Sequence, residues 1–166
     1  MKNTFYETNL STGLEFETEM VQITSEYYRG FYKTMNVSKD SFRASTEEED
    51  RFKGVDFYAD GVPVDVTLII DYKDNCEFDP KTYFFGGQEV KFGFRTGNIH
   101  SVVDERGRRR RQFHKFDEPV LVIGVSYVVR DYLMNVIEDL RKEIGNLLET
   151  AIEFYYKKID LLEEAV

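Results

Sequence analysis

Apolar residues recur every three or four positions near both ends of the chain, as they do on amphipathic helices. The first such segment extends from Leu14 to about Met35. The second extends from Asp131 to Glu164 and keeps the spacing although Gly145 lies in its middle. We therefore predict one helix near the N-terminus and a long helix at the C-terminus.

Short runs rich in β-branched and aromatic residues occupy the middle of the chain, separated by Gly, Pro, Asp and Asn. They predict an antiparallel meander over Phe52–Tyr58, Val62–Tyr72 and Glu89–Thr96. The polar segment Asn36–Asp50 precedes them without periodicity, so we expect a surface loop there. A fourth run, Pro119–Val129, is apolar without alternation, which indicates a central strand buried on both faces.

Together these elements predict a protein of the α/β (α+β) class with a mixed central sheet of about four strands. Residues 1–130 would form the core and residues 131–166 the C-terminal helix of a single domain. That helix could lay one apolar stripe across the protein's own sheet. Alternatively, its length of about 50 Å could carry it past a domain only about 30 Å wide. We expect partial overhang, with residues 131–165 pairing with a second copy as a homodimer.

Composition narrows the class of protein. Hydrophobic residues make up 42% and aromatic residues 15% of the 166 positions, which excludes general disorder. No apolar run reaches the roughly 20 residues of a membrane span, and the first residues lack the apolar region of a signal peptide. We expect a cytoplasmic protein without membrane contact. The one cysteine, Cys76, has no His or Cys neighbour at metal-ligand spacing, and we interpret it as structurally neutral.

Charge is distributed unevenly along the chain. The net charge is −9, and residues 1–50 carry 5 basic against 10 acidic residues, which argues against a surface that embraces nucleic acid as a whole. Residues 104–118 reverse the balance with 6 basic and 4 acidic residues. Such a run is either a solvated loop or hairpin tip, or a set of contacts to the backbone phosphates of nucleic acid. The candidate phosphate contacts are Arg106, Arg108, Arg109, Arg110, Arg111 and Lys115.

The segment Arg51–Thr67 contains the most distinctive acids. Asp56 lies in the first predicted strand and Asp65 in the second, and the turn Ala59-Asp60-Gly61 would bring the two strands side by side. The two carboxylates could then share one divalent cation. An ionised carboxylate among Val and Phe is costly unless it is paired or bound to metal, which favours this interpretation. The alternative is that both acids point outward from a half-solvated sheet face.

Glu17 adds a third acid, in the segment Phe16-Glu17-Thr18-Glu19-Met20-Val21 that opens the first helix. The order of a helix acid, a strand acid and an acid on the next strand resembles the PD-(D/E)XK nuclease superfamily. The resemblance implies a nuclease-like fold in which Glu17, Asp56 and Asp65 bind Mg²⁺ for the hydrolysis of a nucleic acid such as DNA. These three residues would then be both the metal ligands and the catalytic acids.

One position departs from the family's pattern. Where the family has an acid, any residue and then lysine, this chain has Asp65-Val66-Thr67, and threonine carries no positive charge. Lys91 or Lys73 could supply the missing cation. Lys91 is the stronger catalytic candidate, because an unpaired lysine among apolar neighbours would be costly. Alternatively, Lys91 and Arg95 occupy the solvent face of an edge strand.

Three functions remain open. The first is a metal-dependent nuclease or a catalytically impaired relative of one. The second is a non-catalytic accessory or inhibitor protein, of the kind that phages and mobile elements encode, which would act by binding a protein partner. The third is a structural oligomerisation module that depends on the C-terminal helix. The positions of Glu17, Asp56 and Asp65 distinguish them, because a shared metal site requires that the three acids converge.

Overall fold

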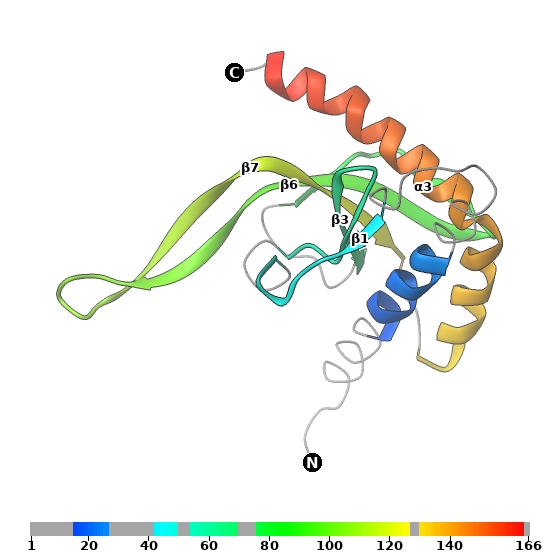
Figure 1. The fold of residues 1–166 in the computed structure, drawn as a ribbon, viewed down its shortest axis with the longest axis horizontal. Coiled ribbons are helices and arrows are strands. Elements are labelled where there is room, and N and C mark those ends of the chain that lie inside the picture. The colour runs from blue at the N-terminus through cyan, green and yellow to red at the C-terminus, as the bar shows by residue number, and fades with distance from the viewer. Residues whose placement is uncertain (1–14, 27–41, 50–53, 70–75, 127–129, 165–166) are drawn as a thin grey trace.

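A mixed β-sheet forms the centre of this computed structural model, which describes residues 15–26, 42–49, 54–69, 76–126 and 130–164 (Figure 1). Within these residues the sheet has seven strands in the order β1-β2-β3-β7-β6-β4, and β5 pairs with β6 beside this path. A helix over residues 15–26 precedes the sheet. The other elements are β1 (Phe42–Ala44), β2 (Phe57–Ala59), β3 (Val62–Leu68), β4 (Cys76–Phe78), β5 (Tyr83–Phe85), β6 (Gln88–Val103), β7 (Arg109–Val125), the 3-10 turn η3 (Arg130–Tyr132) and α3 (Leu133–Glu164). The predicted α+β class with a mixed sheet is confirmed, although the sheet has more strands than expected.

Strand β7 takes the central place that its apolar sequence predicts. It lies between β3, to which it is parallel, and β6, to which it is antiparallel. Residues 120–125 of β7 are all buried. The predicted antiparallel meander is confirmed for β2 and β3, which pair antiparallel, but it is wrong for β6, because β7 separates β3 from β6. A continuously apolar strand is most stable where both of its faces are covered, and the middle of the sheet provides that place.

Several predicted boundaries differ from the structure. Among the described residues of the first predicted strand, only Phe57–Tyr58 belong to β2. The described part of the expected loop Asn36–Asp50, residues 42–49, contains β1 and a helical turn over residues 47–49. The sequence does not predict β4 and β5, because three residues are too few to establish a period. Other parts of the predicted elements lie outside the described residues: 14 and 27–35 of the first helix, 36–41 and 50 of the loop, 52–53 of the first strand, 70–72 of the second and 127–129 of the fourth.

One face of the sheet packs against both helices and forms the main core. Buried side chains of β3, β6 and β7 meet Phe16, Met20 and Ile23 of the first helix and an apolar stripe of α3. The stripe extends from Leu133 to Tyr155, and burial of each large side chain in it stabilises the fold by about 1.5–3 kcal/mol. The apolar stripe of α3 therefore lies on the protein's own sheet. Residues 156–161 are exposed or half-buried, and pairing of residues 131–165 with a second copy stays a prediction.

Strands β6 and β7 continue beyond the sheet as a two-stranded arm (Figure 1). We use the term arm for residues 97–115, where the strands pair from Gly97 with Lys115 to Val103 with Arg109, beyond a register shift between Arg95 and Gly97. Residues 105–115 are all exposed. The basic run therefore forms the tip and one strand of a hairpin, as one of the two interpretations expected. Contact with phosphates stays a prediction.

Candidate metal centre

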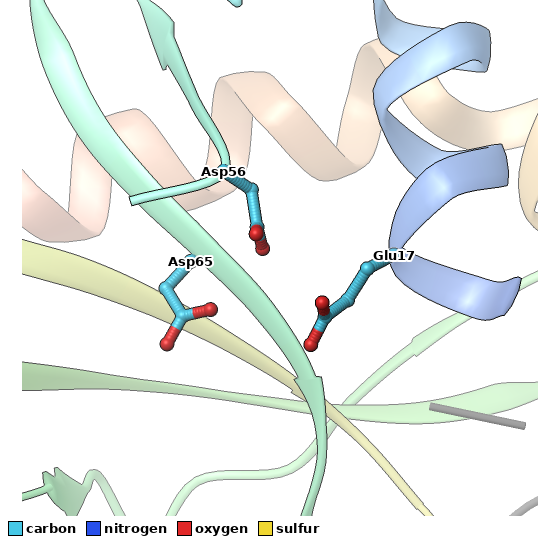
Figure 2. A group of neighbouring side chains, drawn as sticks. All are labelled: Glu17, Asp56 and Asp65. Atoms are coloured by element: carbon cyan, nitrogen blue, oxygen red, sulfur yellow. The ribbon is translucent and has the colours of Figure 1, made fainter. Parts of the chain in front are cut away.

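Glu17, Asp56 and Asp65 converge on one point (Figure 2). Each offers a carboxylate oxygen, and these oxygens lie within 4.8 Å of one another. Glu17 belongs to the helix over residues 15–26, Asp56 is the residue before β2, and Asp65 is in the middle of β3. We call these three residues the acid centre. Oxygen donors at this separation can bind one divalent cation.

A tight turn between β2 and β3 places the two aspartates next to each other. Asp60 and Gly61 have φ of 50° and 79° at this turn. Positive φ at both central residues is what a type I′ hairpin turn requires, and Asp-Gly is a favoured sequence for it. The antiparallel pairing extends to Asp56, whose backbone N–H donates to the carbonyl of Val64 at 2.8 Å. Asp56 is therefore held beside Asp65 by backbone hydrogen bonding.

Glu17 reaches the acid centre because the first helix packs on the sheet. Phe16, Met20 and Ile23 recur at spacings of four and three and are buried in the core. Glu17 follows Phe16 at the edge of this apolar stripe, so packing of the stripe fixes the direction of its side chain. Figure 2 shows its carboxylate pointing toward the two aspartates.

The acid centre holds its negative charges at a cost in free energy. Burial raises the pKa of Asp56 well above its usual range, and the charges of Asp65 and Glu17 raise it further. One hydrogen bond acts in the opposite direction, because the Val66 N–H donates to Asp56 Oδ2 at 2.7 Å. Without a cation, burial and the neighbouring charges therefore favour the protonated form of Asp56. A divalent cation would favour the ionised form and displace this proton.

Arg95 of β6 is a cation that the sequence does not place at this site. Its Nη1 lies 3.7 Å from Asp65 Oδ2, and its Nη2 donates a hydrogen bond to the carbonyl of Gly54 at 2.9 Å. The guanidinium carbon also lies 5.7 Å from the ring centroid of Phe116. The Arg95 side chain is only 12% exposed, and β6 lies between β7 and β4. The interpretation that Arg95 faces solvent on an edge strand is therefore wrong.

A glycine close to Asp56 marks the position of the guanidinium. Gly54 has φ of 65°, and a Cβ at this residue would lie 2.5 Å from Arg95 Nη2. Glycine therefore allows both the backbone conformation and the close approach of Arg95. The order Gly54-Val55-Asp56 is visible in the sequence. The sequence does not show that Arg95 approaches Gly54, because this contact depends on the pairing of β6 with β7 and of β7 with β3.

Lys91, the predicted replacement for the missing lysine, lies on the same face of β6 as Arg95 but in another row of the sheet. Lys91 pairs with Gly124 of β7 and Arg95 pairs with Val120, and Val122 between them pairs with Asp65. Among the described residues, the ion pair at the acid centre is made by Arg95. Lys73 lies outside the described residues. Arg95 is therefore the cation that the described structure brings to an acid of the centre.

Cys76 lies close to the acid centre and pairs with Arg95 across β4 and β6. Burial raises the pKa of its thiol to about 12, and the charge of Asp65 contributes to this increase. The thiol is therefore protonated at neutral pH. A protonated thiol is a poor metal ligand and a poor nucleophile, which agrees with the interpretation of Cys76 as structurally neutral.

The six basic residues that the sequence suggests for phosphate contact lie on the arm, which extends away from the sheet (Figure 1). Asp104 organises the tip of the arm. Its Oδ1 accepts the backbone N–H groups of Arg106 and Arg108 at 2.9 and 2.8 Å, and its Oδ2 lies 3.1 Å from Nε of Arg110. Asp104 thus bridges the backbone of the turn and an arginine side chain of β7.

No protein-family model, curated protein or solved structure matches this chain. In the described part of the chain, no helix is both long and apolar enough to cross a membrane. Function is therefore inferred from the chain's own residues, at the acid centre and on the arm.

Proposed function

We propose that this protein is a divergent PD-(D/E)XK nuclease-like phosphodiesterase that uses Mg²⁺ to hydrolyse nucleic acid. One observation carries the proposal, namely that an acid of the first helix, the acid before β2 and an acid of β3 bring their oxygens within 4.8 Å of one another. Like charges raise the free energy of such a group in the apoprotein, and this arrangement is typical of a site that binds a cation. The residues with proposed catalytic roles are Glu17, Asp56, Asp65 and Arg95.

The donor set fits Mg²⁺. This ion prefers oxygen ligands, needs few protein carboxylates and keeps several waters. The Val66 N–H fixes the orientation of the Asp56 carboxylate through Oδ2. Asp65 is 8% exposed, so its oxygens are largely shielded from competing water. When bound, the ion would polarise the phosphate and lower the pKa of a bound water.

The chain's own groups have separate tasks in this proposal. Glu17, Asp56 and Asp65 would hold the ion, and binding of the ion would favour the deprotonated form of Asp56. Arginine side chains are cations that do not act as bases in proteins, so Arg95 would stabilise negative charge on the scissile phosphate. Its planar guanidinium can contact two phosphate oxygens at once, unlike a lysine ammonium. Arg95 thus takes the electrostatic part of the role that the family assigns to the lysine.

Isothermal titration calorimetry with Mg²⁺ and Mn²⁺ tests the metal centre. Wild-type protein should bind an ion saturably, and Asp56→Asn and Asp65→Asn should both abolish this binding while they keep the side-chain shape. Glu19→Gln is the matched control, because Glu19 lies on the same helix as Glu17 but outside the acid centre. Failure of the wild-type protein to bind either ion would refute the metal centre. Binding without cleavage of DNA or RNA would refute the nuclease.

A second candidate is a non-catalytic accessory protein that acts by binding a protein partner. The ion pair of Arg95 with Asp65 favours it, because this pair compensates one acid without a metal. Thr67 also leaves the position of the family's lysine uncharged. This candidate predicts that the wild-type protein binds no Mg²⁺, so the same calorimetry distinguishes the two. Convergence of the acids argues against a pure oligomerisation module, and a homodimer through residues 131–165 is compatible with either candidate.

A further inference from the structure

The arm has two faces of different chemistry. Side chains alternate between the faces along each strand, and paired residues share a face. One face, which we call the Phe113 face, carries the pairs Ile99 with Phe113, Ser101 with Arg111, Val103 with Arg109 and Gly97 with Lys115. The opposite face carries the pairs Asn98 with His114, His100 with Gln112 and Val102 with Arg110. The paired positions of the Phe113 face contain three cations and no acid.

The cations of the arm differ in whether a carboxylate lies next to them. Asp104 Oδ2 lies 3.1 Å from Nε of Arg110 and 3.8 Å from Nε of Arg108, so it partly neutralises both. The cations of the Phe113 face make no ion pair with a carboxylate of the described residues; they are Arg109, Arg111 and Lys115. Uncompensated positive charge is therefore concentrated on the Phe113 face.

Apolar side chains lie among these cations. Phe113 is 53% exposed, Val103 68% and Ile99 39%. None of the three belongs to a hydrophobic core cluster of the described residues. A ligand that covers this face must therefore offer both anionic groups and apolar surface. Nucleic acid offers both, as phosphates and as base edges.

We propose that the Phe113 face of the arm enters the major groove of double-stranded DNA. The major groove of B-DNA is about 12 Å wide and admits a two-stranded β-ribbon, whereas the deep, narrow major groove of A-form RNA excludes side chains. The paired strands of the arm span about 24 Å, which corresponds to about seven base pairs. In the groove, Arg109 and Arg111 contact phosphates or guanine edges, and Phe113 contacts thymine methyl groups.

The charge of the rest of the chain favours contact through the arm. The whole chain has a net charge of −9 even with the cations of the arm included, so phosphates repel its body. A protruding arm brings cations into the groove while the acidic body stays outside. This inference names double-stranded DNA as the substrate class of the proposed nuclease, and it rests on that proposal for cleavage but not for binding.

Fluorescence anisotropy of a labelled DNA duplex, titrated with the full chain in EDTA, measures binding without metal chemistry. Arg109→Ala/Arg111→Ala should weaken binding by about tenfold or more and reduce the slope of log K against log salt concentration by about two, because two contacts are lost. Arg108→Ala/Arg110→Ala is the matched control. It removes as many arginines from positions that share one carboxylate, that of Asp104, and should weaken binding less than about threefold. Thermal melts followed by circular dichroism check that each variant keeps its fold.

Each other outcome overturns a defined part of the proposal. Equal losses in the two double variants would overturn the assignment to the Phe113 face. Equal affinity for double-stranded RNA or single-stranded DNA would overturn the placement in the major groove. Absence of binding to any nucleic acid would overturn the proposal as a whole. DNA binding in EDTA without Mg²⁺-dependent cleavage would refute only the nuclease, and cleavage unaffected by Arg109→Ala/Arg111→Ala would refute only the role of the arm.

Discussion

The acid centre and the arm both concentrate charge of one sign, but the fold holds that charge in different ways. At the acid centre, a helix and two strands force three carboxylates together, and Asp65 is 8% exposed. On the arm, residues 105–115 are exposed, so their cations are accessible to water. Hydration keeps exposed charges low in free energy, whereas burial of like charges raises the free energy of the folded apoprotein.

This difference separates two kinds of functional inference. An unfavourable arrangement that several rigid elements enforce is itself a sign of function, because packing does not require three acids to meet. Exposed cations on an arm are not by themselves evidence of function. The two faces of the arm differ because Asp104 lies next to Arg108 and Arg110 but makes no ion pair with the cations of the Phe113 face. Variants of the acid centre should therefore change stability as well as activity. Variants of the arm should change binding alone.

Removal of Arg95 should have the largest effect on stability, because it leaves Asp65 buried without its cation. We expect Arg95→Ala to lower the free energy of unfolding by about 3–5 kcal/mol, the usual result of deleting one partner of a buried ion pair. Urea denaturation measures this change. Lys91→Ala is the control on the same face of β6 and should change stability by less than about 0.5 kcal/mol. Equal changes in the two variants would mean that Arg95 contributes packing but no specific ion pairing.

The pH dependence of stability should reveal the repulsion at the acid centre. Folding raises the pKa of Asp56 above its value of about 3.9 in the unfolded chain. Above about pH 4 the folded state therefore binds more protons than the unfolded state, so stability falls as pH rises. For one proton the slope is at most about 1.4 kcal/mol per pH unit. Urea denaturation in EDTA at a series of pH values from about 5 to 8 measures this slope.

Two changes should flatten the slope for different reasons. Asp56→Asn cannot titrate, yet its side-chain oxygen can still accept the hydrogen bond from the Val66 N–H. Saturating Mg²⁺ should stabilise the wild-type protein more at high pH, because the ion binds the deprotonated acids. If the slope persists in Asp56→Asn, another group is responsible for it.

Gly54→Ala should displace Arg95 from its position next to the acid centre and strain the backbone at residue 54. A Cβ at Gly54 would lie 2.5 Å from Arg95 Nη2 at a residue with φ of 65°. Displacement of the guanidinium and backbone strain should together destabilise the protein by about 1–3 kcal/mol. Gly61→Ala is the matched control, since φ is 79° but no atom lies within 4 Å, and it should cost only about 1 kcal/mol. Equal losses in urea denaturation would show that the guanidinium moves aside freely.

The sequence predicts the part of the acid centre that depends on local structure. Asp56 and Asp65 flank a turn whose Asp-Gly sequence is recognisable, and Glu17 follows an apolar residue of a periodic helix. The position of Arg95 depends on two strand pairings between segments far apart in the chain, through β7. Such pairings leave no periodic signal in the sequence. Lys91 and Arg95 are therefore equivalent in the sequence, although the structure places only Arg95 beside Asp65.

The arm is a second part of the fold that the sequence pattern does not predict. Alternation of apolar and polar residues identifies a strand when one face is buried and the other is solvated. Both faces of the arm are solvated, so apolar residues such as Val102 and Val103 occur side by side without alternation. The sequence pattern therefore finds only the ends of β6 and β7 that lie inside the sheet. Burial against the core, and not strand formation itself, is what the pattern records.

Substitutions on the arm should have the smallest effect on stability. Arg109→Ala/Arg111→Ala should change the free energy of unfolding by less than about 0.5 kcal/mol, because both side chains are exposed and lie outside the core. Urea denaturation of this variant beside Arg95→Ala tests the contrast between the two regions directly. A loss above about 1 kcal/mol would show that the arm packs against the body in solution. The positions of the arm cations would then depend on packing against the body. A weaker affinity of Arg109→Ala/Arg111→Ala for DNA could then result from a change in structure and not only from loss of contacts by the Phe113 face.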